Sequence, residues 1–402
     1  MMGLAATREK SKAKGLSSRV VLYGFAFTVF FAIIYVRALQ ESYWAMPGGK
    51  PLFLDFGIFW TMARMAQQGQ ALLAYQSHFV GHDLAGFTGT TTLVTFDWFY
   101  PPPYFFWVWP FGYLSPAYAY ACFMMATGAL YLSALLRTLP GMPTLAAALG
   151  FSGLWLNLMM GQNGFLSAGL LGWALYYLQR RPFVAGMLLG LLTFKPHLGL
   201  LIPLALGLGR QWRCIMAAGL TFLVLLMTSV LAFGWEAWEA WIRNFPLVRL
   251  NLSNPDPVFL AKVSSVYAFV RIQGGTEKLA YACQALVAML VVAMLVWVWR
   301  SKLSQERKLT VLVLSALLVT PYVLEYDLTW LAVAGVWWVK SWGGVKPARS
   351  EYGLLLLLWL LPELMYAFSL WNLRVVLAQP VLLAALGWLW WSSLKGRSAR
   401  HG

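Results

Sequence analysis

The sequence predicts an all-helical protein that crosses a membrane many times. Of its 402 residues, 60% are apolar or aromatic and only 11% are charged, whereas a soluble domain carries about a quarter charged residues on its wetted surface. Long apolar runs follow one another along the chain, and several approach the roughly 20 residues that a bilayer-spanning helix needs. These observations exclude a cytosolic enzyme, a coiled coil and a secreted disulfide scaffold.

The apolar runs predict about 12 transmembrane helices. The first run, 20–36, follows a basic N-terminus and is too long for the apolar part of a cleavable signal, so we interpret it as a retained helix. A shorter run, 104–114, amounts to only about three turns of helix and is too short to span. The other runs are 116–136, 144–160, 164–179, 183–194, 197–208, 214–233, 279–299, 309–322, 327–341, 352–370 and 375–394.

The basic residues predict the orientation of these helices. The chain carries 30 Lys and Arg against 14 Asp and Glu, a net charge of +16. If the N-terminus is cytoplasmic and 104–114 is a re-entrant or half-buried helix, the later basic clusters all fall on the cytoplasmic side, as the positive-inside rule requires. On this map 20 of the 30 basic residues are cytoplasmic. The excess is therefore an orientation signal, and the clustered patch that nucleic-acid binding needs is not seen in the sequence.

A single membrane domain accounts for nearly the whole chain. We expect a cytoplasmic basic N-terminus over 1–19, one integral-membrane domain over 20–394 and a cytoplasmic basic tail over 395–402. Two long extracytoplasmic loops, 40–103 and 234–278, interrupt this domain.

Asp55 begins a segment of the first loop whose apolar residues recur at helical spacing, which predicts an amphipathic helix. A carboxylate at this position caps the free amides of a helix start, or it serves as a proton acceptor at the membrane boundary. Both readings stay open from the residues alone. Farther along the same loop, Tyr100 and the three prolines that follow it predict a rigid corner, and Tyr100 is a candidate to face a site.

Three further polar breaks open on the extracytoplasmic side of this map. They contain Gln162 and Asn163, then Lys195 and His197, and finally Tyr322, Glu325 and Asp327. A lysine between two half-length apolar segments is costly in lipid, so Lys195 either faces protein, water or an anion, or snorkels to the interface.

The second long loop offers two cations for a phosphate group, Arg243 and Arg249. The tryptophans that precede them, from 235 to 241, indicate an interfacial aromatic belt. His78 and His82 are four residues apart, but a solvated loop face explains them better than a metal site does. We therefore expect no metal and no cofactor.

Outward-facing polarity favours an enzyme over a channel or a transporter. A channel needs polar rings through several spans, and a transporter needs matching interruptions in two halves near the midplane. An enzyme that uses a lipid-linked phosphate donor needs only cations for the phosphate and a carboxylate that accepts the proton of an acceptor hydroxyl. The alternatives are a transporter or flippase of lipid-linked sugars and a non-catalytic assembly subunit.

Five motifs, taken in order, resemble glycosyltransferase family 87, a GT-C family that includes polyprenol-phosphate-mannose-dependent α-mannosyltransferases. The resemblance covers roughly residues 20–390. The motifs are Asp55-Phe-Gly-Ile-Phe-Trp, Tyr75, Tyr100-Pro-Pro, Gly161-Gln-Asn-Gly and the segment from Ala185 to Lys195-Pro-His197.

The resemblance implies a GT-C-like helical bundle and inverting transfer of a hexose, expected to be mannose, outside the cytoplasmic membrane. The donor would be a polyprenyl-monophosphate sugar, and the acceptor a lipid- or glycan-linked hydroxyl. Asp55 falls on the family's catalytic aspartate and would be the general base, while Lys195 falls on its Lys-Pro motif and would contact the donor. Tyr322 stands where the family often has a histidine, and Asp327 remains a candidate site residue. Besides the two substrates, membrane lipids are the expected partners.

Overall fold

The computed structural model describes residues 2–41, 54–76, 98–246, 252–253, 257–371 and 375–398. All regular elements within these residues are helices, and the one strand-like feature is an isolated antiparallel bridge between Val263 and Leu324. The predicted all-helical class is therefore confirmed. The α-helices are α1 Met2–Gln40, α2 Leu54–Gln67, α4 Tyr104–Val108, α5 Pro116–Thr138, α6 Met142–Leu149, α7 Ser152–Met160, α8 Gly164–Tyr177, α9 Pro182–Leu191, α10 Ile202–Leu208, α11 Trp212–Phe233, α12 Trp235–Arg243, α14 Pro257–Lys262, α15 Val266–Ile272, α16 Glu277–Arg300, α17 Gln305–Val319, α18 Trp330–Lys340, α19 Arg349–Leu370 and α20 Ala378–Ser398.

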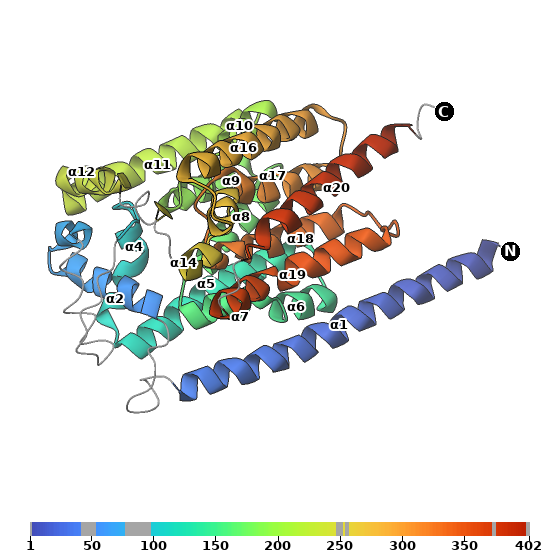
Figure 1. Ribbon diagram of the computed structural model, residues 1–402, viewed down its shortest axis with the longest axis horizontal. Coiled ribbons are helices and arrows are strands. Elements are labelled where there is room, and N and C mark those ends of the chain that lie inside the picture. The colour runs from blue at the N-terminus through green and yellow to red at the C-terminus, as the bar shows by residue number, and fades with distance from the viewer. Residues whose placement is uncertain are drawn as a thin grey trace.

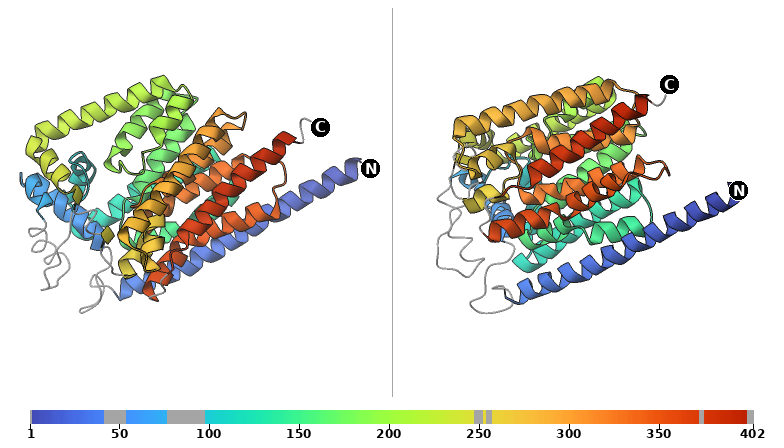
Figure 2. Two further views of the ribbon diagram at one scale, coloured as in Figure 1. Left: turned by 45° about the horizontal axis from the view of Figure 1, so that its top comes forward. Right: turned by 45° about the vertical axis from the view of Figure 1, so that its right-hand side comes forward.

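Four short 3-10 helices complete the list: η1 Ala71–Tyr75, η2 Trp109–Tyr113, η3 Leu192–Phe194 and η4 Glu325–Thr329. The long helices run side by side as one bundle, and both termini lie at the same end of it (Figure 1). Helices α2, α4 and α12 lie at the opposite end, an arrangement that the two rotated views also show (Figure 2). The bundle therefore has one end with the termini and an opposite end with α2, α4 and α12.

Among the described residues, five helices are long and apolar enough to cross a membrane, and α6 and α7, bent by 46° at their junction, make up to six. The five are Ser18–Gln40 within α1, α5, α11, α16 and Arg349–Ser369 within α19. The chain is thus a membrane protein by helix length and composition, but the predicted count of 12 crossings is not confirmed. Several apolar runs form helices too short for such a test; α10, for example, keeps only Ile202–Leu208 of the run that begins after Pro196. Proline lacks the N–H that a continuous helix needs.

The run 104–114 folds into α4 and η2, of five residues each, and both pack against α2. Helices of this length cannot cross a bilayer. The helix predicted after Asp55 is present as α2. It is packed on nearly all sides, with Phe56, Phe59 and Met62 buried and Arg64 exposed, so its amphipathic character stays a prediction.

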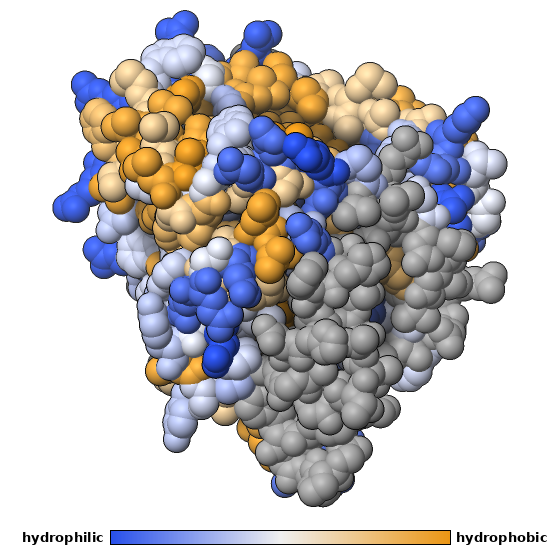
Figure 3. Space-filling model, turned by 90° about the vertical axis from the view of Figure 1, so that its left-hand side faces the viewer, coloured by the Kyte–Doolittle hydropathy of each residue, from blue (hydrophilic) through white to orange (hydrophobic). Residues whose placement is uncertain are grey.

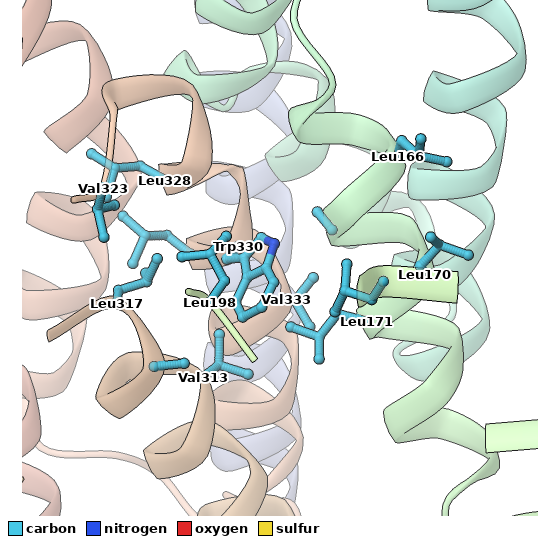
Figure 4. Packing of buried hydrophobic residues seen from close by; sticks show 14 of the residues in the cluster. Leu166, Leu170, Leu171, Leu198, Val313, Leu317, Val323, Leu328, Trp330 and Val333 are labelled. Carbon is cyan, nitrogen blue, oxygen red and sulfur yellow. The ribbon is translucent and has the colours of Figure 1, made fainter. Parts of the chain in front are cut away.

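A dense apolar core joins the elements that carry the polar breaks. Leu171 of α8 lies beside Val333 and Trp330 of α18 in this core, while Leu166 and Leu170 point away from them on another side of α8 (Figure 4). The buried indole of Trp330 donates its hydrogen bond to the Ser167 hydroxyl at 3.1 Å, as buried indoles usually must. The Thr329 hydroxyl donates to the Gly164 carbonyl, also at 3.1 Å. These contacts fix the start of α8 beside η4, which brings two of the polar breaks together.

Candidate active site

A cavity of about 420 Å³ lies among the short helices. Most of its wall is aromatic, with polar groups on one part of it. Much of this wall comes from the end of the bundle that contains α2 and α12. The surface of that end is a mixture of hydrophilic and hydrophobic side chains (Figure 3). The lining residues are Ile58, Phe59, Trp98, Phe99, Tyr100, Gln162, Phe194, Lys195, Pro196, His197, Trp241, Asn244, Phe245, Leu252, Tyr281, Tyr322, Tyr326 and Asp327.

Stacked rings form the aromatic wall. Tyr100 stacks on Tyr104 with ring centroids 4.2 Å apart, and Tyr104 stacks on Phe194 at 5.0 Å. Trp241 of α12 joins this wall from the other side, because its indole donates to the Phe99 carbonyl at 2.9 Å. Faces of this kind bind the apolar faces of sugars and the isoprene units of a lipid by contact alone.

Asp55 is linked to the cavity wall by a hydrogen bond from the Gln162 side-chain amide. The Gln162 carboxamide donates from Nε2 to Asp55 Oδ2 at 2.8 Å, and its Oε1 accepts from the Asn163 backbone N–H at 3.2 Å. Asn163 in turn donates from Nδ2 to the Tyr104 hydroxyl at 2.9 Å. Gly161 makes this turn possible, since its φ of 68° at the end of α7 lies in the left-handed region.

Lys195 and Asp327 form a buried ion pair, each side chain only 2% exposed. Lys195 also lies over the Tyr326 ring, with Nζ 4.7 Å from the centroid, and Asp327 Oδ2 accepts from the Leu324 backbone N–H at 3.2 Å. Burial lowers the pKa of Lys195, and the adjacent Asp327 carboxylate opposes that shift. An ion pair removed from water in this way survives only because each charge has its partner.

Glu325 is a further buried carboxyl group, in η4 with the cavity residues Tyr326 and Asp327. It is 2% exposed and its Oε2 has no hydrogen-bond partner among the described residues. Burial raises the pKa of Glu325 to about 8, against the opposing effect of the Lys262 charge. The bridge between Val263 and Leu324 places Lys262 across from Glu325, because neighbours of a bridged antiparallel pair face each other.

Asp55 belongs to the same electrostatic group. Burial raises the pKa of Asp55, whereas the hydrogen bond from Gln162 and the charge of Lys262 both lower it. The side chain nevertheless keeps partial exposure. A carboxylate whose pKa is raised while it stays partly accessible is a suitable proton acceptor.

A comparison with protein families matches residues 98–321, more than half of the chain, to glycosyltransferase family 87. The chain belongs to glycosyltransferase family 87. Comparisons with curated proteins and with solved structures find no match. Family membership makes this membrane protein a glycosyltransferase and is consistent with the GT-C superfamily. The matched region contains Gln162 and Lys195, but it begins after Asp55 and ends before Asp327.

The structure of this glycosyltransferase brings most of the predicted site residues together. Six of them line the cavity: Tyr100, Gln162, Lys195, His197, Tyr322 and Asp327. Three others adjoin lining residues: Asp55 and Asn163 are hydrogen bonded to Gln162, and Glu325 lies in η4 with Asp327.

Of the two predicted loop cations, the structure places Arg243, which is not part of this assembly. The Arg243 side chain is 77% exposed and pairs with Glu239 at 2.7 Å on its own helix. Arg249, His78 and His82 lie outside the described residues. In the parts of the chain that the structure does describe, no three His, Cys, Asp or Glu side chains gather in the way that would hold a metal ion.

Two residues of the candidate site could not be identified from the sequence. Lys262 ends a six-residue helix in the second long loop, and no motif distinguishes it from the other loop cations. Trp241 was expected in an interfacial belt, but its indole bonds within the protein and its ring lines the cavity. The helical spacing of Trp238 and Trp241 was the available signal, since three residues place both on one face.

Proposed function

We propose that this glycosyltransferase moves a hexose, with mannose the expected sugar, from a polyprenyl-monophosphate donor to a lipid- or glycan-linked acceptor. Asp55 is the general base. The observation that carries this proposal is that Asp55, a partly exposed carboxylate on α2, is hydrogen bonded to a residue of the cavity wall. The helix-cap role of Asp55, at the first turn of α2, is compatible with it.

The reaction is a single inverting displacement. Asp55 accepts the proton of the acceptor hydroxyl, the freed oxygen forms a bond to the anomeric carbon, and the bond from that carbon to the phosphate oxygen breaks. The polyprenyl phosphate leaves with the electron pair. General-base assistance of this kind contributes about 10² to 10⁴ in rate.

Lys195 is the candidate phosphate contact, together with its partner Asp327. Both side chains line the cavity, and the ion pair keeps Lys195 charged and in place although it is buried. His197 lines the cavity beside them, and its Nε2 has no hydrogen-bond partner among the described residues. Burial lowers the pKa of His197 to about 4, so this ring is a neutral hydrogen-bonding group for a sugar hydroxyl. The aromatic wall suits the sugar ring and the first isoprene units.

The reaction takes place on the extracytoplasmic side of the cytoplasmic membrane, with both termini cytoplasmic. Two observations support this placement. The basic clusters follow the positive-inside rule on the predicted map, and the cavity lies among helices at the end of the bundle opposite the two termini (Figure 1).

Purified protein incubated with a panel of polyprenyl-phosphate sugars and glycan acceptors tests the proposal. Formation of a glycosylated acceptor from the mannose donor is the expected result. Counting glycosylated product against translocated donor in proteoliposomes separates this enzyme from a flippase. Translocation without any product would refute the proposal.

A further inference from the structure

Gln162 stands between Asp55 and the cavity, and its carboxamide has only one possible orientation. A backbone N–H can only donate and an ionised carboxylate can only accept. Because the Asn163 N–H approaches Oε1, the amide nitrogen of Gln162 must point at Asp55. The side chain is 6% exposed, so neighbouring atoms hold it there.

We propose that Gln162 is a positioning residue that keeps the Asp55 carboxylate ionised and directed toward the acceptor hydroxyl. This inference rests on the proposed role of Asp55 as the base. The Gln162 amide offers Oδ2 a donor and no acceptor, so it favours the charged carboxylate over the protonated acid. This bond to Oδ2, at 2.8 Å, uses one acceptor position of the carboxylate and leaves others for the proton of the acceptor hydroxyl.

The backbone explains why Gln162 holds this place. Gly161 ends α7 in the left-handed region, with φ 68°, and the Gln162 N–H donates to the Asn157 carbonyl at 3.2 Å. The Asn157 side chain then accepts from the Gly164 N–H at 2.9 Å, which starts α8. Both ends of the turn are therefore tied to Asn157, and the glutamine has little freedom to leave Asp55.

Other groups around Asp55 act on its charge without contacting it. Lys262 of α14 favours the ionised form, while Glu325 and Tyr326 of η4 carry charges or dipoles coupled to it. On the remaining sides of α2 the titratable neighbours are tyrosines that bond elsewhere. The Tyr75 hydroxyl donates to the Tyr100 carbonyl, and the Tyr120 hydroxyl donates to the Leu158 carbonyl. Within the described parts of the chain, Gln162 is thus the neighbour that donates a hydrogen bond to the carboxylate, at 2.8 Å.

Gln162→Met tests the proposal, because methionine has a similar length and no donor. Loss of a hydrogen bond to an ionised group raises the pKa of that group by about one to two units. The acid limb of the transfer rate should move to higher pH by that amount, and the rate should recover above it. Gln162→Glu should move the limb in the same direction, since a second carboxyl replaces the donor.

A readout without substrate keeps the test independent of the acceptor. In nanodiscs, the infrared band of protonated carboxyl groups is titrated against pH, and the component that is missing in Asp55→Asn is assigned to Asp55. Its midpoint should rise by about one to two pH units in Gln162→Met. If that variant does not fold, Gln162→Glu gives the same comparison.

Gln284 provides a matched control. It is 4% exposed, its Oε1 accepts from the Tyr267 N–H at 3.1 Å and its Nε2 donates to the Leu318 carbonyl at 3.0 Å. Gln284→Met should lower stability without moving the Asp55 midpoint or the acid limb. An unmoved midpoint in a folded Gln162 variant overturns the positioning role and leaves the base role intact. Normal transfer by Asp55→Asn overturns the base role instead, so the two failures are distinguishable.

Discussion

Replacing Lys195 and Asp327, singly and together, separates the structural role of their ion pair from its role in donor binding. Both side chains are 2% exposed, so neither charge can be left to water. Removing one partner of such a pair costs about 3–5 kcal/mol, because the other charge stays buried without compensation. Lys195→Met and Asp327→Asn should each lose about this much stability, with Asp327→Asn at the lower end. Its amide oxygen can still accept from the Leu324 N–H, which Asp327 now holds at 3.2 Å.

The double variant Lys195→Met/Asp327→Asn removes both charges and should lie within about 1–2 kcal/mol of the wild type. The sum of the single losses would be about 6–10 kcal/mol, so the double-mutant cycle should return a coupling of several kcal/mol. Equilibrium unfolding in detergent or bicelles measures all four corners. A double variant as unstable as that sum would refute the ion-pair reasoning. The folded double variant also tests function: an unchanged KM for the donor would remove Lys195 from the phosphate site.

Three other predictions concern single residues. Asp55→Asn should stay folded and membrane-inserted but lose about 10² to 10⁴ in transfer rate in reconstituted vesicles; near-normal turnover would contradict the base role. Gly164→Ala should destabilise the start of α8, because a Cβ there would lie 2.4 Å from Asn157 Oδ1 and 2.5 Å from the Tyr326 carbonyl oxygen. Gly207→Ala on α10 is the control, because a Cβ there meets no atom within 4 Å. Equal melting temperatures for the two variants would contradict the reasoning. The pKa of Glu325 is raised from 4.5 to about 8, so the free energy of unfolding should fall as pH rises through that range, because only the unfolded chain loses the proton there. Glu325→Gln should reduce this pH dependence in thermal unfolding between pH 5 and about 8. An unaltered pH dependence would argue against a buried neutral acid.

Hydrophobicity predicted the helices well and their crossings poorly. Every apolar run contains a helix, because main-chain groups in an apolar environment must bond internally. Length was harder to foresee, since breaks such as Pro196 and the 46° bend between α6 and α7 are set by packing as well as by composition. The short run 104–114 was predicted not to span, and it forms two short helices against α2.

The polar breaks predicted which residues meet, but not how they pair. Sequence placed Lys195 and Asp327 near one cavity as separate candidates, one for phosphate and one for the site wall. Their ion pair joins positions 132 residues apart and follows from the packing of η4 against the start of α8. Arg243 shows the opposite case, since a local i,i+4 contact with Glu239 holds it at the surface. The place of Lys262 near Glu325 could not be predicted, because it depends on one bridge between residues far apart in the sequence.

The carboxyl groups of the candidate site differ in how their negative charge is compensated. A polyprenyl-phosphate donor brings negative charge into a cavity with little water, so unpaired carboxylates there would repel it. Asp327 is paired with Lys195, and Asp55 is held by Gln162 with Lys262 nearby. The Oε2 atom of Glu325 has no hydrogen-bond partner among the described residues, and burial raises the pKa of Glu325 to about 8 against the effect of the Lys262 charge, which keeps it neutral at pH 7. Among the described residues, Asp55 is a site carboxylate that forms no direct ion pair with a cation, which leaves it available as a base beside an anionic donor.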